Sequence, residues 1–281
     1  MIELPIIGSL LEATGTILEK KVLRNNGLDP RHYTTYEFLA IFLVMLPFAF
    51  LFWKINPLAS SLKNILLFAF VIIVATFANL LIFYSLKREK VSEFEPIWLM
   101  QSVFVIILAF IFYKSERNIT LFWLAIVANV ALISAHVRKH HLVFDKYILA
   151  ALFGSFLFAV ELVASKSLLP YYNPFAFYFI RCFFILLICY ICFRPNGKGL
   201  NKGNIWMILA VGAMWAIYRV IMYHGYVYMD ILSTTMLFAL SPVFVFIFAV
   251  VFLKEKPDWR QISSTVIIVI CVALAILFGN K

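Results

Sequence analysis

GSLLEATGTILEK (residues 8–20) and GSFLFAVELVASK (residues 154–166) are two apolar stretches with the same layout. Each begins with Gly-Ser, carries an internal glutamate (Glu12 or Glu161), and has a lysine at its end, Lys20 or Lys166. A carboxylate inside so apolar a stretch predicts a position that faces away from lipid. The shared layout predicts an internal repeat.

The composition of the chain is that of a membrane protein. Of its 281 residues 64% are hydrophobic and 14% charged, and the mean hydropathy is +0.97, whereas soluble domains are about 45–50% apolar. The net charge of +10 lies in short loops between apolar runs, which favours contact with lipid headgroups over nucleic acid. We therefore expect an integral membrane protein, in the cell (plasma) membrane, with membrane lipids as partners and no nucleic acid.

Ten segments are long and apolar enough to cross a bilayer core of about 30 Å. They are residues 4–22, 32–53, 62–86, 90–113, 119–136, 147–169, 171–193, 203–228, 230–253 and 258–278. A basic linker over 136–146 leaves five segments on each side. We predict an all-α membrane protein with a first five-helix repeat over 1–144, including the linker, and a second over 145–281.

Further positions correspond between the two halves in the same order. They are Gly8-Ser9 with Gly154-Ser155, Pro30 with Pro174, Glu37 with Arg181, Tyr84 with Tyr223, and residues 101–117 with 240–256, which sets Glu116 on Glu255. An odd number of spans per half requires opposite insertion, so the pattern predicts ten transmembrane helices as two inverted repeats around a central cavity.

The loops predict an orientation. Most Lys and Arg residues lie in the loops that follow the first, third, fifth, seventh and ninth segments. The positive-inside rule puts those loops in the cytoplasm and both termini outside.

NPFAFYFIR (173–181) and LSPVFVFIFAVVFLKEKPDWRQ (240–261) give the chain a family resemblance. Together with the ten segments and the repeat, they resemble the EamA-like family of the drug/metabolite transporter superfamily over essentially the whole chain. The most specific part is Pro242 followed by Glu255. The first half departs from the pattern, with Val103 and Glu37 where a proline and an arginine would stand. The resemblance implies a transporter of small molecules, with both termini cytoplasmic, the opposite of what the loops predict.

Charged residues deep in the predicted helices mark the candidate site. A lipid-facing charge costs about 2.5–3.5 kcal/mol, so these side chains are expected to face an internal cavity or one another. The candidate substrate ligands are Glu12, Asn79, Gln101, Glu161, Arg181, Tyr218, Arg219 and Tyr223.

Two interpretations of these charges remain open. In the first, Arg181 and Arg219 bind an anionic group such as a carboxylate, and Glu12 or Glu161 binds an amine or carries a coupled proton. In the second, the charges form buried ion pairs, Glu37 with Arg181, and Glu12 or Glu161 with Arg219.

The remaining polar and special residues suggest narrower roles. Pro242 inside the ninth segment predicts a hinge or a static kink. His224 is a candidate proton relay or a partner in an inter-helix hydrogen bond. His136, His140 and His141 lie in the basic linker without acidic or thiol partners, so we expect no metal site and no cofactor.

The sequence contains none of the common catalytic or phosphate-binding motifs, so we expect no enzyme. The first hypothesis is a secondary transporter that moves a small organic metabolite, amino-acid-like or zwitterionic, by alternating access. The alternatives are a multidrug or lipophilic-compound exporter of the same fold, and a membrane-embedded enzyme or lipid-handling protein.

Overall fold

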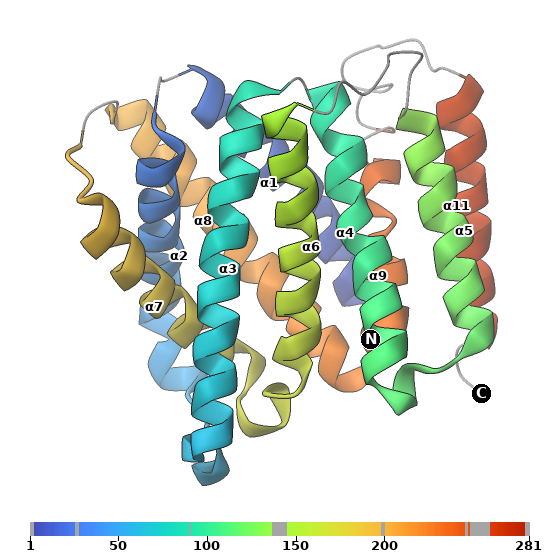
Figure 1. Cartoon of the computed structure of the whole chain (residues 1–281), viewed down its shortest axis with the longest axis horizontal. Helices are drawn as coiled ribbons and strands as arrows, with labels where there is room; N and C mark the ends of the chain where they lie inside the picture. The colour runs from blue at the N-terminus through green and yellow to red at the C-terminus, as the bar shows by residue number, and fades with distance from the viewer. Residues whose placement is uncertain are drawn as a thin grey trace.

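A computed structural model describes residues 3–25, 28–89, 91–136, 145–197, 200–244, 247 and 259–278. These residues form ten α-helices: α1 (Glu3–Asn25), α2 (Pro30–Phe52), α3 (Leu62–Arg88), α4 (Val91–Phe112), α5 (Ile119–His136), α6 (Lys146–Lys166), α7 (Pro174–Phe193), α8 (Lys202–Tyr228), α9 (Ile231–Phe238) and α11 (Trp259–Phe278) (Figure 1). Three 3-10 turns lie at Pro57–Ser60, Lys114–Glu116 and Leu169–Tyr171. Each of the ten predicted segments overlaps one of these helices.

The ninth helix is shorter than predicted. The sequence predicted a helix over 230–253, but α9 ends at Phe238 and helical geometry resumes only at Ser241. The cause is Pro242, whose ring has no N–H and clashes with the carbonyl four residues earlier, that of Phe238. The helix therefore breaks one turn before the proline. Residues 248–253 lie outside the described part of the chain.

The second helix of each half begins in the same way. Asp29 accepts a hydrogen bond from the Arg31 N–H at 2.8 Å, and Asn173 accepts one from the Phe175 N–H at 2.9 Å. Each cap is followed by a proline at the first helical position, where a missing N–H costs nothing. The predicted correspondence between the two motifs is therefore confirmed in structure.

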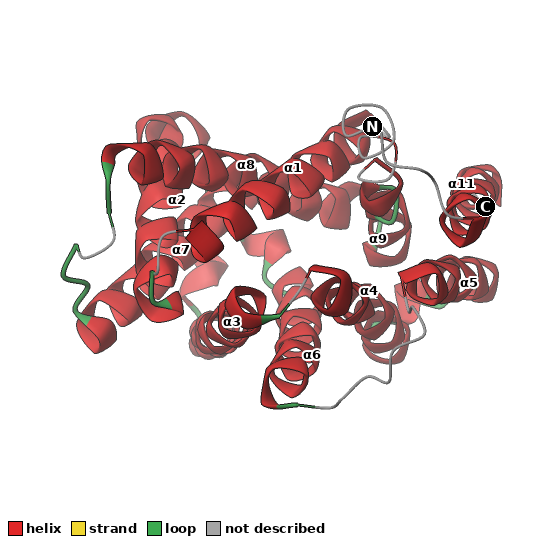
Figure 2. Ribbon diagram, turned by 90° about the horizontal axis from the view of Figure 1, so that it is seen from above, coloured by secondary structure: helices red, strands yellow, loops and turns green. Residues whose placement is uncertain are grey.

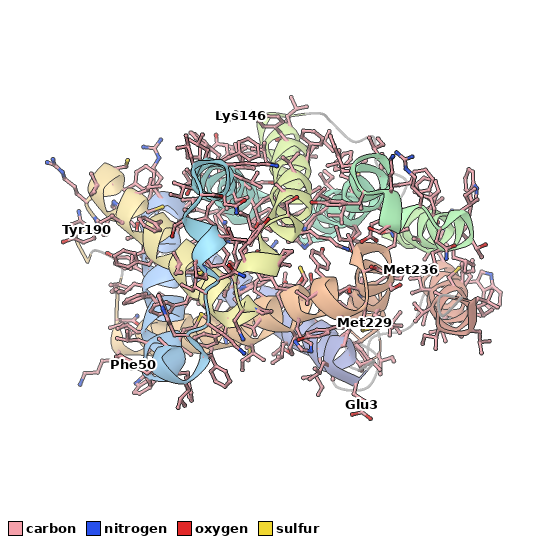
Figure 3. All side chains as sticks on the ribbon, turned by 90° about the horizontal axis from the view of Figure 1, so that it is seen from below. Glu3, Phe50, Lys146, Tyr190, Met229 and Met236 are labelled. Atoms are coloured by element: carbon pink, nitrogen blue, oxygen red, sulfur yellow. The ribbon has the colours of Figure 1, made fainter. Side chains whose placement is uncertain are left out.

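The outer surface of the bundle is apolar. Five of the described helices, α2, α3, α6, α7 and α8, are long and apolar enough to cross a membrane by length and composition. Phe50 is 91% exposed and Tyr190 60% exposed, and both point outward at the edge of the bundle (Figure 3). Exposed aromatics would be costly in water but suit contact with lipid, so the protein is an integral membrane protein.

The two halves pack on each other with the symmetry of an inverted repeat. The first helix of each half packs against the third helix of the other half, since α1 packs on α8 and α6 packs on α3. The second helices pair as α2 with α7, and the fifth helices as α5 with α11. Figure 2 shows α1 beside α8 on one side of the molecule and α6 between α3 and α4 on the other.

The Gly-Ser pairs lie where the first helix of each half, α1 or α6, packs against the other half. A Cβ on Gly8 would lie 2.5 Å from the Phe238 ring of α9 and 3.4 Å from Ile221 on α8, and a Cβ on Gly154 would lie 3.0 Å from Ile82 on α3. Ile221 stands two residues before Tyr223 just as Ile82 stands two before Tyr84. Small residues let membrane helices approach closely, so both glycines allow close contact between the halves.

The two serines that follow also make equivalent bonds. The Ser9 hydroxyl donates to the Pro5 carbonyl of its own helix at 2.9 Å and also approaches the Leu237 carbonyl of α9 at 3.3 Å. The Ser155 hydroxyl donates to the Ile97 carbonyl of α4 at 3.2 Å. The contacts with Leu237 and Ile97 each join the first helix of one half to the fourth helix of the other. The shared layout of the two stretches therefore places a Gly-Ser pair in each of two contacts between the halves. We call these two contacts, made by Gly8-Ser9 and by Gly154-Ser155, the seams.

Alternating helices define two faces. The odd-loop face carries residues 28–29, 89, 194–197 and 200–201. The even-loop face carries residues 53–61, 113–118, 167–173 and 229–230. The start of α1 and the end of α11 lie toward the even-loop face, in the lower half of Figure 1.

Candidate functional site

A buried cluster of charges lies at the centre of the second half. Glu161 on α6 accepts hydrogen bonds from the Arg181 guanidinium on α7 and from the Tyr223 hydroxyl on α8, the latter at 2.9 Å. The Arg219 guanidinium lies 3.9 Å from the other Glu161 oxygen. Glu161 and Arg181 are at most 1% exposed. The prediction that Glu161 points inward is therefore confirmed.

The pairing within this cluster decides between the predicted ion pairs. The partner of Arg181 is Glu161 and not Glu37, so that predicted pair is wrong. The predicted pair of Glu161 with Arg219 is found at the outer limit of an ion pair. Three consecutive helices of one half supply all of these groups, which the alignment of Glu37 with Arg181 could not reveal.

A cavity of about 410 Å³ lies between the two halves. Helices α1, α3, α4 and α5 line it from the first half, and α6, α8 and the α9 region line it from the second. Of the predicted ligands, Glu12, Gln101 and Tyr218 lie in its wall, together with the predicted hinge Pro242. This volume is within the usual range of about 300–1,000 Å³ for small-molecule sites.

Glu12 is the acidic group of this main cavity. Its carboxylate accepts a hydrogen bond from the Tyr218 hydroxyl at 3.1 Å. The Tyr218 ring is held by edge contacts with Trp215 and Phe238, with centroids 5.2 Å apart in both cases. The carboxylate is therefore held in a fixed position at the cavity wall, with aromatic surfaces close by.

Amide groups add hydrogen-bonding capacity to the main cavity. The side-chain oxygens of Gln101 and Asn129 have no hydrogen-bond partner, whereas the Asn129 amide nitrogen is occupied by the Ala125 carbonyl at 2.9 Å. Asn129 was missed by the sequence analysis, although a polar amide within the apolar segment 119–136 was a signal for it. Two unpartnered acceptors in one wall could bind the donor groups of a ligand.

Lysines lie at one end of the main cavity. Lys20 and Lys21, near the end of α1, line it together with Leu86 and Phe94. These residues lie toward the odd-loop face, so the cavity extends to that side. At the opposite end its wall is formed by Tyr226 and Thr235.

A smaller chamber of about 40 Å³ adjoins the main cavity and shares four wall residues with it: Thr16, Leu86, Phe94 and Trp98. Its polar wall residues are Thr16, Glu19, Glu37, Asn79, Trp98, Tyr178, Arg181, Trp215 and Arg219. The predicted ligands Asn79, Arg181 and Arg219 therefore face this side chamber and not the main cavity. The Asn79 amide nitrogen donates to the Ala75 carbonyl of its own helix at 2.7 Å.

The even-loop end is closed by an ionic latch around Glu116. This fully buried carboxylate pairs with Lys166 at the end of α6 and accepts the Ile231 and Leu232 N–H groups at 2.9 and 3.1 Å. It therefore caps the start of α9, where a helix has unsatisfied N–H groups and a positive dipole end. Because Glu116 belongs to the first half, the latch joins both halves.

Other predicted positions lie apart from the site. Tyr84, aligned with Tyr223, is 39% exposed and packs on Tyr147 with ring centroids 5.0 Å apart. The His224 ring packs on the Tyr228 ring, with ring centroids 4.4 Å apart. His140, His141 and Glu255 lie outside the described residues. Within the described residues, no group of three His, Cys, Asp or Glu side chains is placed to hold a metal ion.

Comparison with known proteins identifies relatives of this arrangement. The pseudopaline exporter CntI of Pseudomonas aeruginosa, in strains UCBPP-PA14 and PAO1, is 27% identical over 130 residues, 46% of this chain and 45% of the relative. The match thus spans about half the length of these curated relatives. The crystal structure of another protein superposes with a TM-score of 0.74 at 15% identity, over 99% of this chain and 98% of that one, a likeness of fold alone.

The family comparison covers both halves separately. The model of the EamA-like transporter family matches residues 2–135 and again residues 145–277. These two matches agree with the two inverted five-helix units and the cavity between them. The chain belongs to the EamA-like transporter family.

Proposed function

We propose that this transporter moves a small amphoteric metabolite, amino-acid-like or otherwise zwitterionic, across the plasma membrane by alternating access. The observation that carries the proposal is the main cavity, which combines a fixed carboxylate, unpartnered amide oxygens and a lysine-lined end. Such a mixture of charges suits a substrate that itself carries both signs. The exporter name of the curated relative supports an outward direction.

Direct substrate contacts come from the main cavity in this proposal. Glu12 and Tyr218 bind the substrate amine, and the Gln101 and Asn129 side-chain oxygens accept its further donors. Lys20 and Lys21 attract its carboxylate at the odd-loop end, which the loop charges put in the cytoplasm. Glu161, Arg181 and Tyr223 bond to one another outside the main cavity. The predicted role of Arg181 and Arg219 as carboxylate ligands is tested by Arg181→Gln and Arg219→Gln in the assay below.

The test uses the purified protein in liposomes with a mixture of radiolabelled amino acids. Wild-type protein should give saturable uptake. Glu12→Gln should reduce it by about 10–100-fold, because a lost charge-assisted hydrogen bond costs about 1.5–3 kcal/mol. Glu3→Gln is the control, since Glu3 is an exposed acid of the same helix. Uptake that is unchanged in Glu12→Gln would contradict the assignment.

A second candidate function has its own supporting observation. Phe94, Trp98 and Phe238 line the main cavity beside the carboxylate, and aromatic faces attract organic cations. A lipophilic-cation exporter would transport cationic dyes and be indifferent to amino acids. The same liposomes, loaded with a fluorescent cation, decide between the two functions.

A further inference from the structure

We propose that the side chamber is a proton-binding site, in which Glu19 on α1 and Glu37 on α2 hold one proton between them. The site itself rests only on the geometry of the chamber. Its use as the coupling site for transport rests on the proposed function above. The sequence had suggested Glu12 or Glu161 for proton coupling, and neither residue lies in this chamber.

Both carboxylates are buried with an unsatisfied oxygen. Glu19 and Glu37 are each 3% exposed, and Glu19 Oε1 and Glu37 Oε2 have no hydrogen-bond partner. An isolated buried carboxylate without hydrogen bonds is strongly disfavoured in its ionised form. A proton on one of the two acids removes that cost and supplies a donor.

Counting charges gives the number of protons. The buried network contains three carboxylates, Glu19, Glu37 and Glu161, and two guanidinium groups, Arg181 and Arg219. Glu161 forms an ion pair with Arg181 and a longer one, at 3.9 Å, with Arg219. Arg219 also attracts Glu37. Two positive charges balance two carboxylates, so the third is neutral only when it binds a proton.

Among the described residues that line the chamber, Arg181 and Arg219 are the only cations. The titratable and charged groups that face Glu19 and Glu37 come from three helices: Tyr33 from α2, Tyr178 and Arg181 from α7, and Arg219 from α8. The buried Tyr33 hydroxyl interacts with both carboxylates, and with Glu19 more strongly than with Glu37. It is placed to donate to whichever of the two acids remains ionised.

The chamber is placed to couple this proton to the substrate. Thr16 and Trp98 belong to the walls of both the side chamber and the main cavity. A change at Glu19, which follows Thr16 by three residues on α1, can therefore reach the substrate cavity directly. The proton enters as H⁺ from water, converts one carboxylate to a carboxylic acid, and leaves again as H⁺ on the other side of the membrane.

Infrared spectroscopy of the purified protein tests the site without a substrate. A carboxylic acid gives a C=O band distinct from those of a carboxylate, so the difference between wild type and each variant isolates this site. At neutral pH, Glu19→Gln and Glu37→Gln should each lose the band completely, because two carboxylates then remain for two arginines. Arg219→Gln should double the band, because three carboxylates then share one guanidinium and need two protons.

Controls make each outcome decisive. Glu3→Gln should leave the band unchanged, and thermal unfolding in detergent should show that every variant compared is folded. If folded Glu19→Gln and Glu37→Gln keep the full band, or if folded Arg219→Gln does not increase it, the site is not the one proposed. A band that appears only when sodium is replaced by choline would assign the chamber to sodium and overturn the proton assignment.

Transport then tests the coupling, and its failure is separable from failure of the proposed function. In liposomes, Glu37→Gln should retain amino-acid counterflow but lose accumulation driven by a pH gradient. Loss of neither activity would overturn the coupling role. If wild-type protein shows no amino-acid counterflow, the substrate proposal fails, while the infrared result still decides whether the chamber binds a proton.

Discussion

Removing the charge of Glu116 is expected to open the even-loop end of the transporter. Glu116 is bonded to Lys166 and to two N–H groups at the start of α9. Glu116→Gln keeps the shape but loses the ion pair, and it turns an amide NH₂ toward a backbone donor. Loss of one partner of a buried ion pair costs about 3–5 kcal/mol.

The lower end of that range applies here. The Lys166 side chain is 17% exposed and has Asp230 as a second acid at 3.6 Å, so part of its charge remains compensated. A cost of about 3 kcal/mol, carried by the closed form only, shifts the equilibrium toward the open form roughly a hundredfold.

A thiol at Thr235 reports this opening. Thr235 lines the main cavity near the start of α9 and its hydroxyl has no hydrogen-bond partner, so Thr235→Cys should be tolerated. Cys192 is exposed, whereas Cys182, Cys189 and Cys271 are buried, so the background needs Cys192→Ser. A membrane-impermeant thiol reagent on the even-loop side should then react roughly a hundredfold faster when Glu116→Gln is added.

The same experiment can refute the reasoning. Glu3→Gln removes an exposed carboxylate on the same face and should leave the rate unchanged. An unchanged rate in folded Glu116→Gln protein would mean that the latch does not hold this end closed. Faster labelling from the odd-loop side alone would reverse the assignment of the closed face.

Three further changes have expected effects on stability, measured by thermal unfolding in detergent. Gly212→Ala should destabilise by about 1–3 kcal/mol, because its Cβ would lie 2.9 Å from the Ile41 backbone nitrogen, whereas Gly15→Ala meets only ordinary contacts from 3.7 Å and serves as its control. Asp230→Gly should stabilise by about 1 kcal/mol, since Asp230 has a φ of 74° that favours glycine. Ser155→Ala should cost about 1 kcal/mol by removing its bond to Ile97, and equal stability would show that this seam does not depend on the hydroxyl.

The sequence predicted the helices well because their signals are local. Apolar length located the ten segments, and the Asp-Pro and Asn-Pro pairs marked the starts of α2 and α7 through side-chain caps that act within three residues. The break in α9 was harder to predict from the sequence. Pro242 predicted a bend, but it did not predict that the described helix would end at Phe238. The helix ends there because the proline ring would clash with the Phe238 carbonyl in a continuous helix.

The partners of the buried charges could not be predicted in the same way. Depth along a helix follows from residue number, but the direction of a side chain around the helix axis is set by packing against other helices. Glu12 and Glu161 were both expected to face inward, yet Glu12 lines the main cavity and Glu161 holds two arginines. Glu19 was not among the candidate ligands, and its position beside Glu37 depends on how α1 and α2 pack against α8.

The matching seams made by Gly8-Ser9 and Gly154-Ser155 bear on how such a carrier reverses. Suppose that each half adopted the conformation of the other. Each glycine contact and each serine hydrogen bond would then be replaced by its counterpart, and the free energy of the contacts between the halves would hardly change. Inward-open and outward-open forms would then be nearly equal in energy. Net movement would follow whichever gradient is imposed, so the same molecule could run backwards when that gradient is inverted.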